Sequence, residues 1–129
     1  MAVQPHPAVV DAYWQAVRDR DASGIADLVT EDFIEDWPQS GERIRGAAAW
    51  AQVVNGHPTY PSVSVRRILG SGDVFVCEAE FDYGGESAAW HICSIMELSG
   101  ERIRRIVQYF GAPFPTPEWR REITEPIGP

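Results

Sequence analysis

The sequence contains no lysine, so arginine supplies all 11 of its basic residues. Together with 19 acidic residues they give a formal net charge of −8. The arginines are dispersed along the chain as short pairs, whereas phosphate binding requires a basic face. We therefore expect no nucleic-acid partner. The exclusive use of arginine also suggests a bacterial genome rich in G and C.

Cysteine, histidine and long apolar runs are scarce as well. Two cysteines, Cys77 and Cys93, and three scattered histidines are present, without a CxxC motif or the spacing of a zinc site. The apolar runs fall short of the roughly 18 residues that a membrane span requires, and the N-terminus lacks a basic-then-apolar signal pattern. We expect a cytoplasmic protein with no metal, no cofactor and no membrane partner.

The 129 residues, of which 44% are hydrophobic and 23% charged, are typical of one domain (1–129) that encloses a core and a pocket. The first half predicts three helices. Apolar residues at helical spacing indicate a helix from about Pro7 to Arg20, a shorter one that Asp21 can cap, and a third that stops at Asn55-Gly56. A short strand that ends before Pro38 separates the second helix from the third.

The second half predicts a meander of four antiparallel strands. Alternating residues lead into the two-residue turn Gly84-Gly85, which sets a register for the hairpin around it. The expected facing pairs are Tyr83 with Glu86, Phe81 with Ala88, Ala79 with Trp90, and Cys77 with Ile92. This register puts Cys93 on the face opposite Cys77, which disfavours a disulfide, and puts His91 across from Glu78 on the outer face.

The last strand and the tail depart from simple alternation. Residues 103–110 predict a β-bulge, which leaves open whether Arg104 or Arg105 points inward. The tail, 111–129, is rich in proline, yet Phe114 and Trp119 give it apolar anchors. Since burying an aromatic side chain is favourable by roughly 1.5–3 kcal/mol, we expect the tail to pack on the domain.

A candidate general base lies in the segment Phe33-Ile34-Glu35-Asp36-Trp37-Pro38, where apolar and acidic residues alternate until the proline. Phe33, Glu35 and Trp37 would share one face, and Ile34 and Asp36 the other. Asp36 would lie at the strand end beside an apolar neighbour and large aromatics, where desolvation raises the pKa of a carboxylate. The alternative is a solvated aspartate on an edge strand.

Several short motifs resemble the SnoaL-like branch of the nuclear transport factor 2-like superfamily. They are Tyr13-Trp14, Asp21 before Gly24-Ile25-Ala26-Asp27-Leu28, Glu31-Asp32-Phe33, Gly46 ahead of a helix, Gly100-Glu101-Arg102-Ile103, and Tyr109-Phe110. The resemblance extends from Val10 to Trp119. It implies an α+β fold: a cone-shaped barrel in which a curved, mostly antiparallel sheet wraps around three N-terminal helices. It also implies a pocket between the helices and the sheet, often in a homodimer.

Within this superfamily the sequence is similar to the catalytic pattern of ketosteroid isomerase. Tyr13 falls where that enzyme has a tyrosine, and Asp36 where it has its base, with one residue inserted before the proline. The isomerase's second oxyanion-hole acid corresponds to Ser94, a weaker donor. Polyketide cyclases and epoxide hydrolases of this fold place an aspartate near the end of the last strand, where this chain has Gly111, or Gln108 if the register slips.

These expectations favour a cofactor-independent isomerase, cyclase or dehydratase. Asp36 would remove a proton next to a carbonyl, and Tyr13, with Ser94, would stabilise the enolate oxygen. The hydrophobic substrate would contact Trp14, Trp50, Phe75, Phe81, Trp90, Ile92 and Met96. The missing second acid favours an alternative, in which the chain binds a hydrophobic metabolite without catalysis or acts as an accessory dimeric domain. A purely structural domain fits the aromatic concave face poorly.

Overall fold

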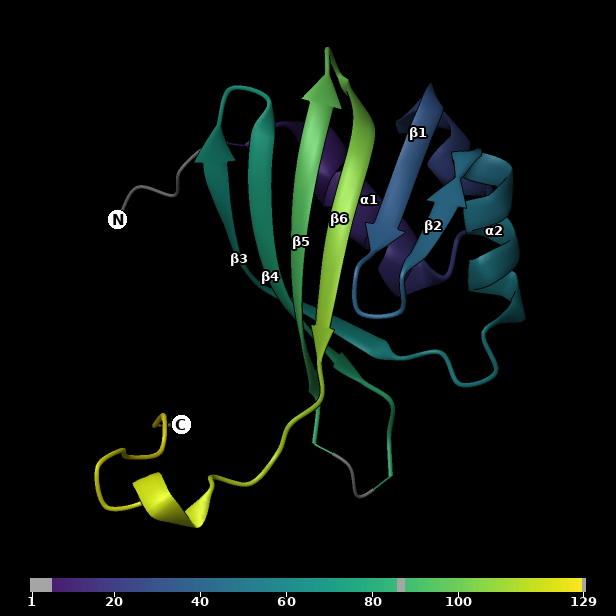
Figure 1. Cartoon of the computed structure of the whole chain (residues 1–129). Helices are drawn as coiled ribbons and strands as arrows, with labels where there is room; N and C mark the ends of the chain where they lie inside the picture. Colours follow the sequence, from purple (N-terminus) through teal and green to yellow (C-terminus); the bar gives the residue numbers. More distant parts are fainter. Residues whose placement is uncertain (1–5, 86–87, 129) are drawn as a thin grey trace.

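The computed structural model describes residues 6–85 and 88–128, and a curved sheet of six strands organises this part of the chain (Figure 1). The strands are β1 (Val29–Trp37), β2 (Glu42–Arg45), β3 (Ser62–Ser71), β4 (Val74–Asp82), β5 (Trp90–Ser99) and β6 (Arg102–Gly111). Their order is β2-β1-β6-β5-β4-β3, and each neighbouring pair is antiparallel except β1 and β6. The predicted α+β class and the four-stranded meander are confirmed.

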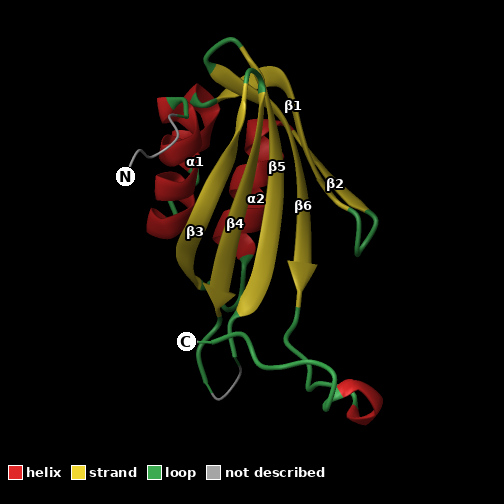
Figure 2. Cartoon of the chain, turned by 90° about the vertical axis from the view of Figure 1, so that its left-hand side faces the viewer, coloured by secondary structure: helices red, strands yellow, loops and turns green. Residues whose placement is uncertain are grey.

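Two α-helices, α1 (Ala8–Asp19) and α2 (Gly46–Gly56), cover one face of the sheet in the described chain (Figure 2). The second predicted helix is a short 3₁₀ helix, η1 (Ser23–Asp27), so two of the three predicted helices are α-helices. A segment this short has few apolar residues to bury. The Asp21 carboxylate accepts a bond from the Gly24 amide in this segment. The cone-shaped barrel stays a prediction.

Arg20 joins the end of α1 to the end of α2. It adopts a left-handed conformation that stops α1, and its guanidinium donates to the carbonyl oxygens of Val54, Asn55 and His57. A cation at the carbonyl end of a helix is favourable because those carbonyls lack partners within the helix. The two helices are therefore held together at one end.

The hairpin of β4 and β5 has a different register from the predicted one. Phe81 faces Trp90, Ala79 faces Ile92, and Cys77 faces Ser94. The connection is thus longer than a two-residue turn, and the expected pair Tyr83–Glu86 involves a residue outside the described ones. Because the shift is two residues, each side chain keeps its predicted face.

The residues of the outer face confirm that each side chain keeps its predicted face. His91 pairs with Glu80 instead of the expected Glu78, and both glutamates lie on the outer face, where they bind Arg66 and Arg67. The two cysteines are free, as the predicted faces required.

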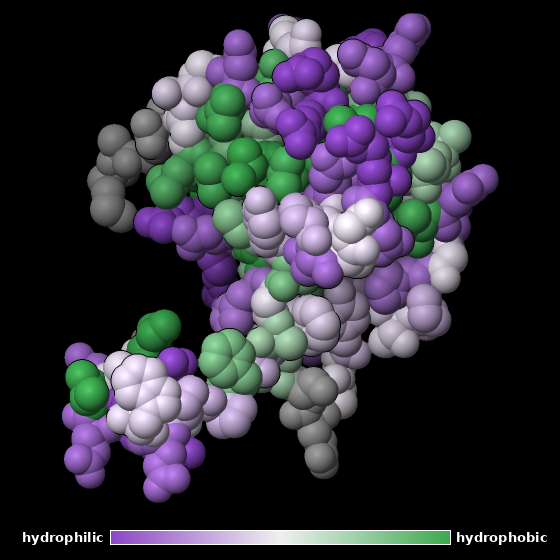
Figure 3. Space-filling view, viewed as in Figure 1, coloured by the Kyte–Doolittle hydropathy of each residue, from purple (hydrophilic) through white to green (hydrophobic). Residues whose placement is uncertain are grey.

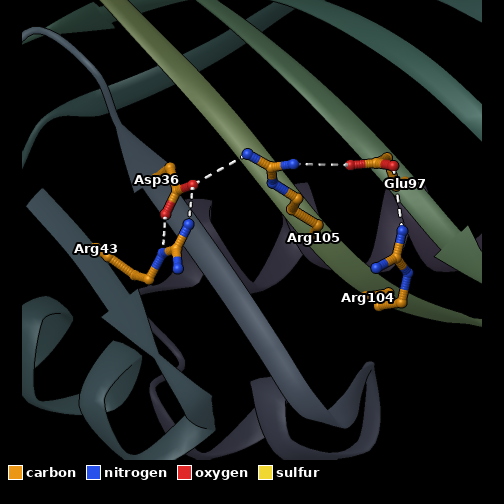
Figure 4. Close-up of polar contacts among 5 residues, drawn as sticks. All are labelled: Asp36, Arg43, Glu97, Arg104 and Arg105. Atoms are coloured by element: carbon orange, nitrogen blue, oxygen red, sulfur yellow. Dashed lines mark hydrogen bonds and ion pairs between the residues drawn. The ribbon is translucent and has the colours of Figure 1, made fainter.

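The predicted bulge lies in β6 at Arg104. Glu97 faces Arg105 whereas Leu98 faces Ile103, so Arg104 is the extra residue. Both arginines turn to the outer face, where Arg104 binds Glu97 and Arg105 binds Glu97 and Asp36 (Figure 4). Neither arginine enters the core, which answers the question that the sequence left open.

The C-terminal tail leaves the domain after β6 and stands off from it (Figure 3). A short 3₁₀ helix, η2 (Glu118–Arg120), follows Pro117 in the tail. Phe114 and Trp119, however, are 75% and 74% exposed. The expectation that the tail packs on its own domain is therefore wrong, because the extended segment 112–117 carries both aromatics beyond reach of the core.

Candidate functional site

A cavity of about 620 Å³ lies between the helices and the inner face of the sheet. Its walls are rich in aromatic side chains, which are Tyr13, Trp14, Trp37, Trp50, Tyr60, Phe81, Tyr83, Trp90 and Phe110. Cavities of this size with a few polar groups are typical of small-molecule sites. The resemblance implied a pocket between the helices and the sheet, which is where this cavity lies.

Only some of the residues that we expected to contact a substrate line the cavity. Trp14, Trp50, Phe81 and Trp90 line the cavity. Phe75, Ile92 and Met96 are buried in the core and are not among the lining residues. The five of them that lie on strands, Phe75, Phe81, Trp90, Ile92 and Met96, are on the predicted face. Alternation therefore found the face but could not show how far along each strand the cavity extends.

Glu35 is the buried acid of the cavity wall. It lies on the inner face of β1 and is 2% exposed. The Tyr13 hydroxyl donates to its Oε1 at 2.9 Å, and the Trp37 indole Nε1 donates to its Oε2 at 2.8 Å. Burial raises the pKa of Glu35, while the hydrogen bonds from Trp37 and Tyr13 oppose that rise. Burial and the nearby Glu35 charge also raise the pKa of Tyr13 well above its ordinary value.

These opposing effects give Glu35 the properties of a proton-transfer group. A desolvated carboxylate binds a proton more readily than one in water, whereas two donors stabilise its ionised form. A carboxyl group balanced in this way can accept a proton from a bound molecule and return it.

Asp36 lies on the opposite face of β1, away from the cavity. Arg43 donates to its carboxylate at 2.6 and 2.9 Å, and Arg105 donates at 3.1 Å (Figure 4). Arg43 foremost, together with Arg105, lowers the pKa of Asp36 against a smaller desolvation effect. The expectations that its pKa is raised and that it shares a cavity with Tyr13 are therefore wrong. The β-hairpin places Arg43 directly opposite Asp36, and β6 brings Arg105 alongside.

Ser94 is fully buried and does not line the cavity. Its hydroxyl donates to Oε1 of Gln108 at 2.7 Å, and these two residues face each other in the pairing of β5 with β6. Gln108 itself lines the cavity. The sequence indicates Gln108 only as a possible position of the aspartate that related enzymes carry. A correct register from Ser94 to Gln108 is the signal that could have identified it.

Gln39 fixes the turn between β1 and β2 beside the cavity. Its Nε2 donates to the carbonyl oxygen of Gln108 at 3.3 Å, and its Oε1 accepts a bond from the Phe110 amide at 3.2 Å. Pro38 prevents β1 from continuing as a hydrogen-bonded strand, so the Gln39 side chain replaces the backbone there. Gln39 also lines the cavity and holds its rim against β6.

No group of three or more histidine, cysteine, aspartate or glutamate side chains within residues 6–85 and 88–128 is arranged to hold a metal ion. In the same part of the chain, none of the helices is long and apolar enough to cross a membrane.

Residues 10–106 match the SnoaL-like domain family. The chain therefore belongs to the SnoaL-like family, within the nuclear transport factor 2-like superfamily, as its motifs indicated. No match was found among the curated proteins.

Solved structures share the fold over most of their length. An NTF2-like protein of unknown function from Burkholderia xenovorans is 34% identical, with a TM-score of 0.78 over 94% of each chain. A proposed ketosteroid isomerase from Kribbella flavida is 20% identical, with a TM-score of 0.83 over 95% of this chain and 89% of that one. A proposed polyketide cyclase from Sinorhizobium meliloti is 15% identical, with a TM-score of 0.69 over 80% and 94%. The last two show the fold alone.

Proposed function

We propose that the chain binds an apolar, carbonyl-containing small molecule and that Glu35, in place of Asp36, transfers a proton at the carbon next to the carbonyl. The observation that carries this proposal is a buried carboxyl group in an aromatic cavity wall, held by Tyr13 and Trp37. The reaction classes that fit are a cofactor-independent isomerisation, cyclisation or dehydration.

The proposed step is a reversible enolisation. The ionised Glu35 accepts the proton, the electrons of the C–H bond form a carbon–carbon double bond, and the carbonyl electrons move to oxygen. Return of the proton to another carbon completes an isomerisation. A positioned base of this kind contributes about 10²–10⁴-fold in rate. Tyr13 and Trp37 orient the carboxyl group and stabilise its charge after the proton has left.

A second candidate is binding without catalysis. Both oxygens of Glu35 already accept bonds from the protein, and the Tyr13 hydroxyl that we expected to act on an enolate is engaged with Glu35. Such an arrangement can also be a structural feature of a dry pocket.

We keep a homodimer as the proposed assembly, supported by the exposed Phe114 and Trp119, whose burial against a second copy would be favourable.

The experiment that separates the two candidates is hydrogen–deuterium exchange at the α carbon of an apolar ketone. We choose 2-tetralone in D₂O, followed by the loss of its α-proton NMR signal. The wild-type chain is expected to accelerate exchange over buffer, and Glu35→Gln to remove about 10²–10⁴-fold of that rate.

Asp36→Asn is the matched control, because it neutralises the adjacent carboxylate on the opposite face. It should exchange like the wild type. Equal rates in the wild type and Glu35→Gln, with 2-tetralone bound by both, would reject proton transfer and leave the binding function.

A further inference from the structure

Gln108 presents an amide to the cavity whose orientation is fixed from behind. Its side chain is on the inner face of β6, lines the cavity and is 4% exposed. Oε1 of this amide accepts the Ser94 hydroxyl proton at 2.7 Å. Since Ser94 is fully buried, that bond is shielded from water and holds the amide plane.

The other half of the same amide is free. With Oε1 bound to Ser94, Nε2 is on the opposite branch of the amide, and within the described residues it donates to no protein acceptor. Nε2 is not one of the fully buried side-chain atoms that lack a partner within the described residues, so it is open to the cavity. An acceptor on a bound molecule would satisfy it.

The sheet places this amide on the strand beside that of Glu35, two residues further along. In the parallel pairing of β1 with β6, Glu35 faces Ile106, and Gln108 follows two residues further on the same face. Neighbouring strands are about 4.8 Å apart, so a small molecule lying across both strands reaches the carboxyl group and the amide together.

The two hydroxyls that we expected to stabilise an enolate are both engaged elsewhere. Tyr13 donates to Glu35, and Ser94 donates to Gln108. A hydrogen-bond donor for a substrate oxygen is therefore still required. The Nε2 group of Gln108 is an unused donor on the same cavity wall as Glu35.

We propose that Nε2 of Gln108 donates a hydrogen bond to the carbonyl oxygen of the bound molecule, and that Ser94 is the positioning residue that fixes the amide. This inference rests on the proposed function. It narrows the substrates to molecules whose acceptor oxygen lies beside Gln108 on β6 when the carbon that loses the proton lies beside Glu35 on β1. As the α proton moves to Glu35, negative charge develops on that oxygen and the bond from Nε2 strengthens.

A matched pair of probes tests the inference by binding alone. 2-Tetralone carries the acceptor oxygen, whereas 2-methylenetetralin has the same shape with a CH₂ group in its place. Calorimetry should show that the wild type prefers the ketone by about fivefold, the scale of one neutral hydrogen bond. Gln108→Leu should abolish the preference and leave the affinity for the alkene unchanged.

Two further variants keep the test decisive if Gln108→Leu folds poorly. Gln108→Glu keeps the shape but replaces the donor with an acceptor, so it should also lose the preference for the ketone. Ser94→Ala frees the amide to rotate and should lose part of the preference while Gln108 remains. Exchange of 2-tetralone by Gln108→Leu should fall at least about tenfold in kcat, with a smaller change in KM, because the bond is strongest in the transition state.

Equal affinity of the wild type for ketone and alkene would overturn the inference, as would a Gln108→Leu variant that weakens both probes equally. Failure of the wild type to bind either probe would overturn both the inference and the proposed function. If Glu35→Gln retains the exchange rate while Gln108 still decides the preference for the ketone, proton transfer by Glu35 is rejected and recognition by Gln108 stands.

Discussion

The inner and outer faces of β1 differ although the chain alternates between them at every residue. On the inner face Glu35 is enclosed by aromatic side chains and bound by two neutral donors. On the outer face Asp36 belongs to a chain of ion pairs that runs through Arg105 to Glu97 and Arg104 (Figure 4). Two adjacent carboxyl groups therefore have pKa values shifted in opposite directions. Environment, more than residue type, decides which acid can do chemistry.

The largest expected effect concerns the packing of the inner face. Phe33 is fully buried on that face, whereas Ile34 beside it is half-buried on the outer one. Phe33→Ala should lower the free energy of unfolding by about 3–5 kcal/mol, through lost burial and a new cavity. Ile34→Ala should lower the free energy of unfolding by clearly less than Phe33→Ala does. Urea denaturation measures both, and similar costs would show that the two faces are buried alike.

A pH profile should separate the inner acid from ordinary carboxylates. Exchange of 2-tetralone requires ionised Glu35, so the rate should rise as the pH passes upward through its raised pKa. Tyr13→Phe removes a donor that stabilises the ionised form, so the rising limb should move to higher pH and the rate on that limb should fall a few-fold. A limb unmoved in Tyr13→Phe would mean that another group controls the rate.

The outer acid should affect stability instead of rate. The pKa of Asp36 is lowered in the folded chain, so its ion pairs stabilise above the pKa of the unfolded state and cease to do so as the pH falls through the lowered value. Asp36→Asn should therefore lower the Tm by a few degrees at most near pH 7, the scale of an exposed ion pair. That difference should vanish in strong acid. If the Tm difference between the wild type and Asp36→Asn persists in strong acid, it arises from packing and not from the ion pairs.

The smallest expected effect concerns the tail. Phe114 and Trp119 bury little surface in the chain, so truncation after Gly111 should leave the Tm of the monomer nearly unchanged. Thermal melting at low protein concentration measures this. A large decrease in Tm would show that the two aromatics are buried, and its dependence on concentration would show whether a second copy buries them.

The sequence predicted the fold where local periodicity decides it. Helical spacing found α1 and α2, strand alternation found the inner face of β4 and β5, and the irregular residues of β6 indicated the bulge at Arg104. The hairpin register was wrong by two residues because Gly84-Gly85 matches a tight turn that the longer connection does not use. Because the error is two residues, every side chain stays on its predicted face, and the buried face was predicted correctly.

The site was predicted less well because its chemistry depends on pairs distant in the chain. Nothing local to Asp36 shows that Arg105 will lie beside it, a contact that requires the parallel pairing of β1 with β6. The alternation did place Glu35 with Phe33 and Trp37, but the position of Asp36 at the strand end and the resemblance to ketosteroid isomerase both favoured Asp36 as the base. Gln108 could be assigned only once its pairing with Ser94 was known.

The most direct test of this account is a measurement of the two carboxyl pKa values in the free protein, by ¹³C NMR of labelled side chains during a pH titration. Glu35→Gln and Asp36→Asn assign the two signals. The account predicts a pKa of Glu35 above its ordinary value of 4.5 and a pKa of Asp36 below its ordinary value of 3.8. A Glu35 that titrates at or below its ordinary value, with Asp36 above its own, would contradict it.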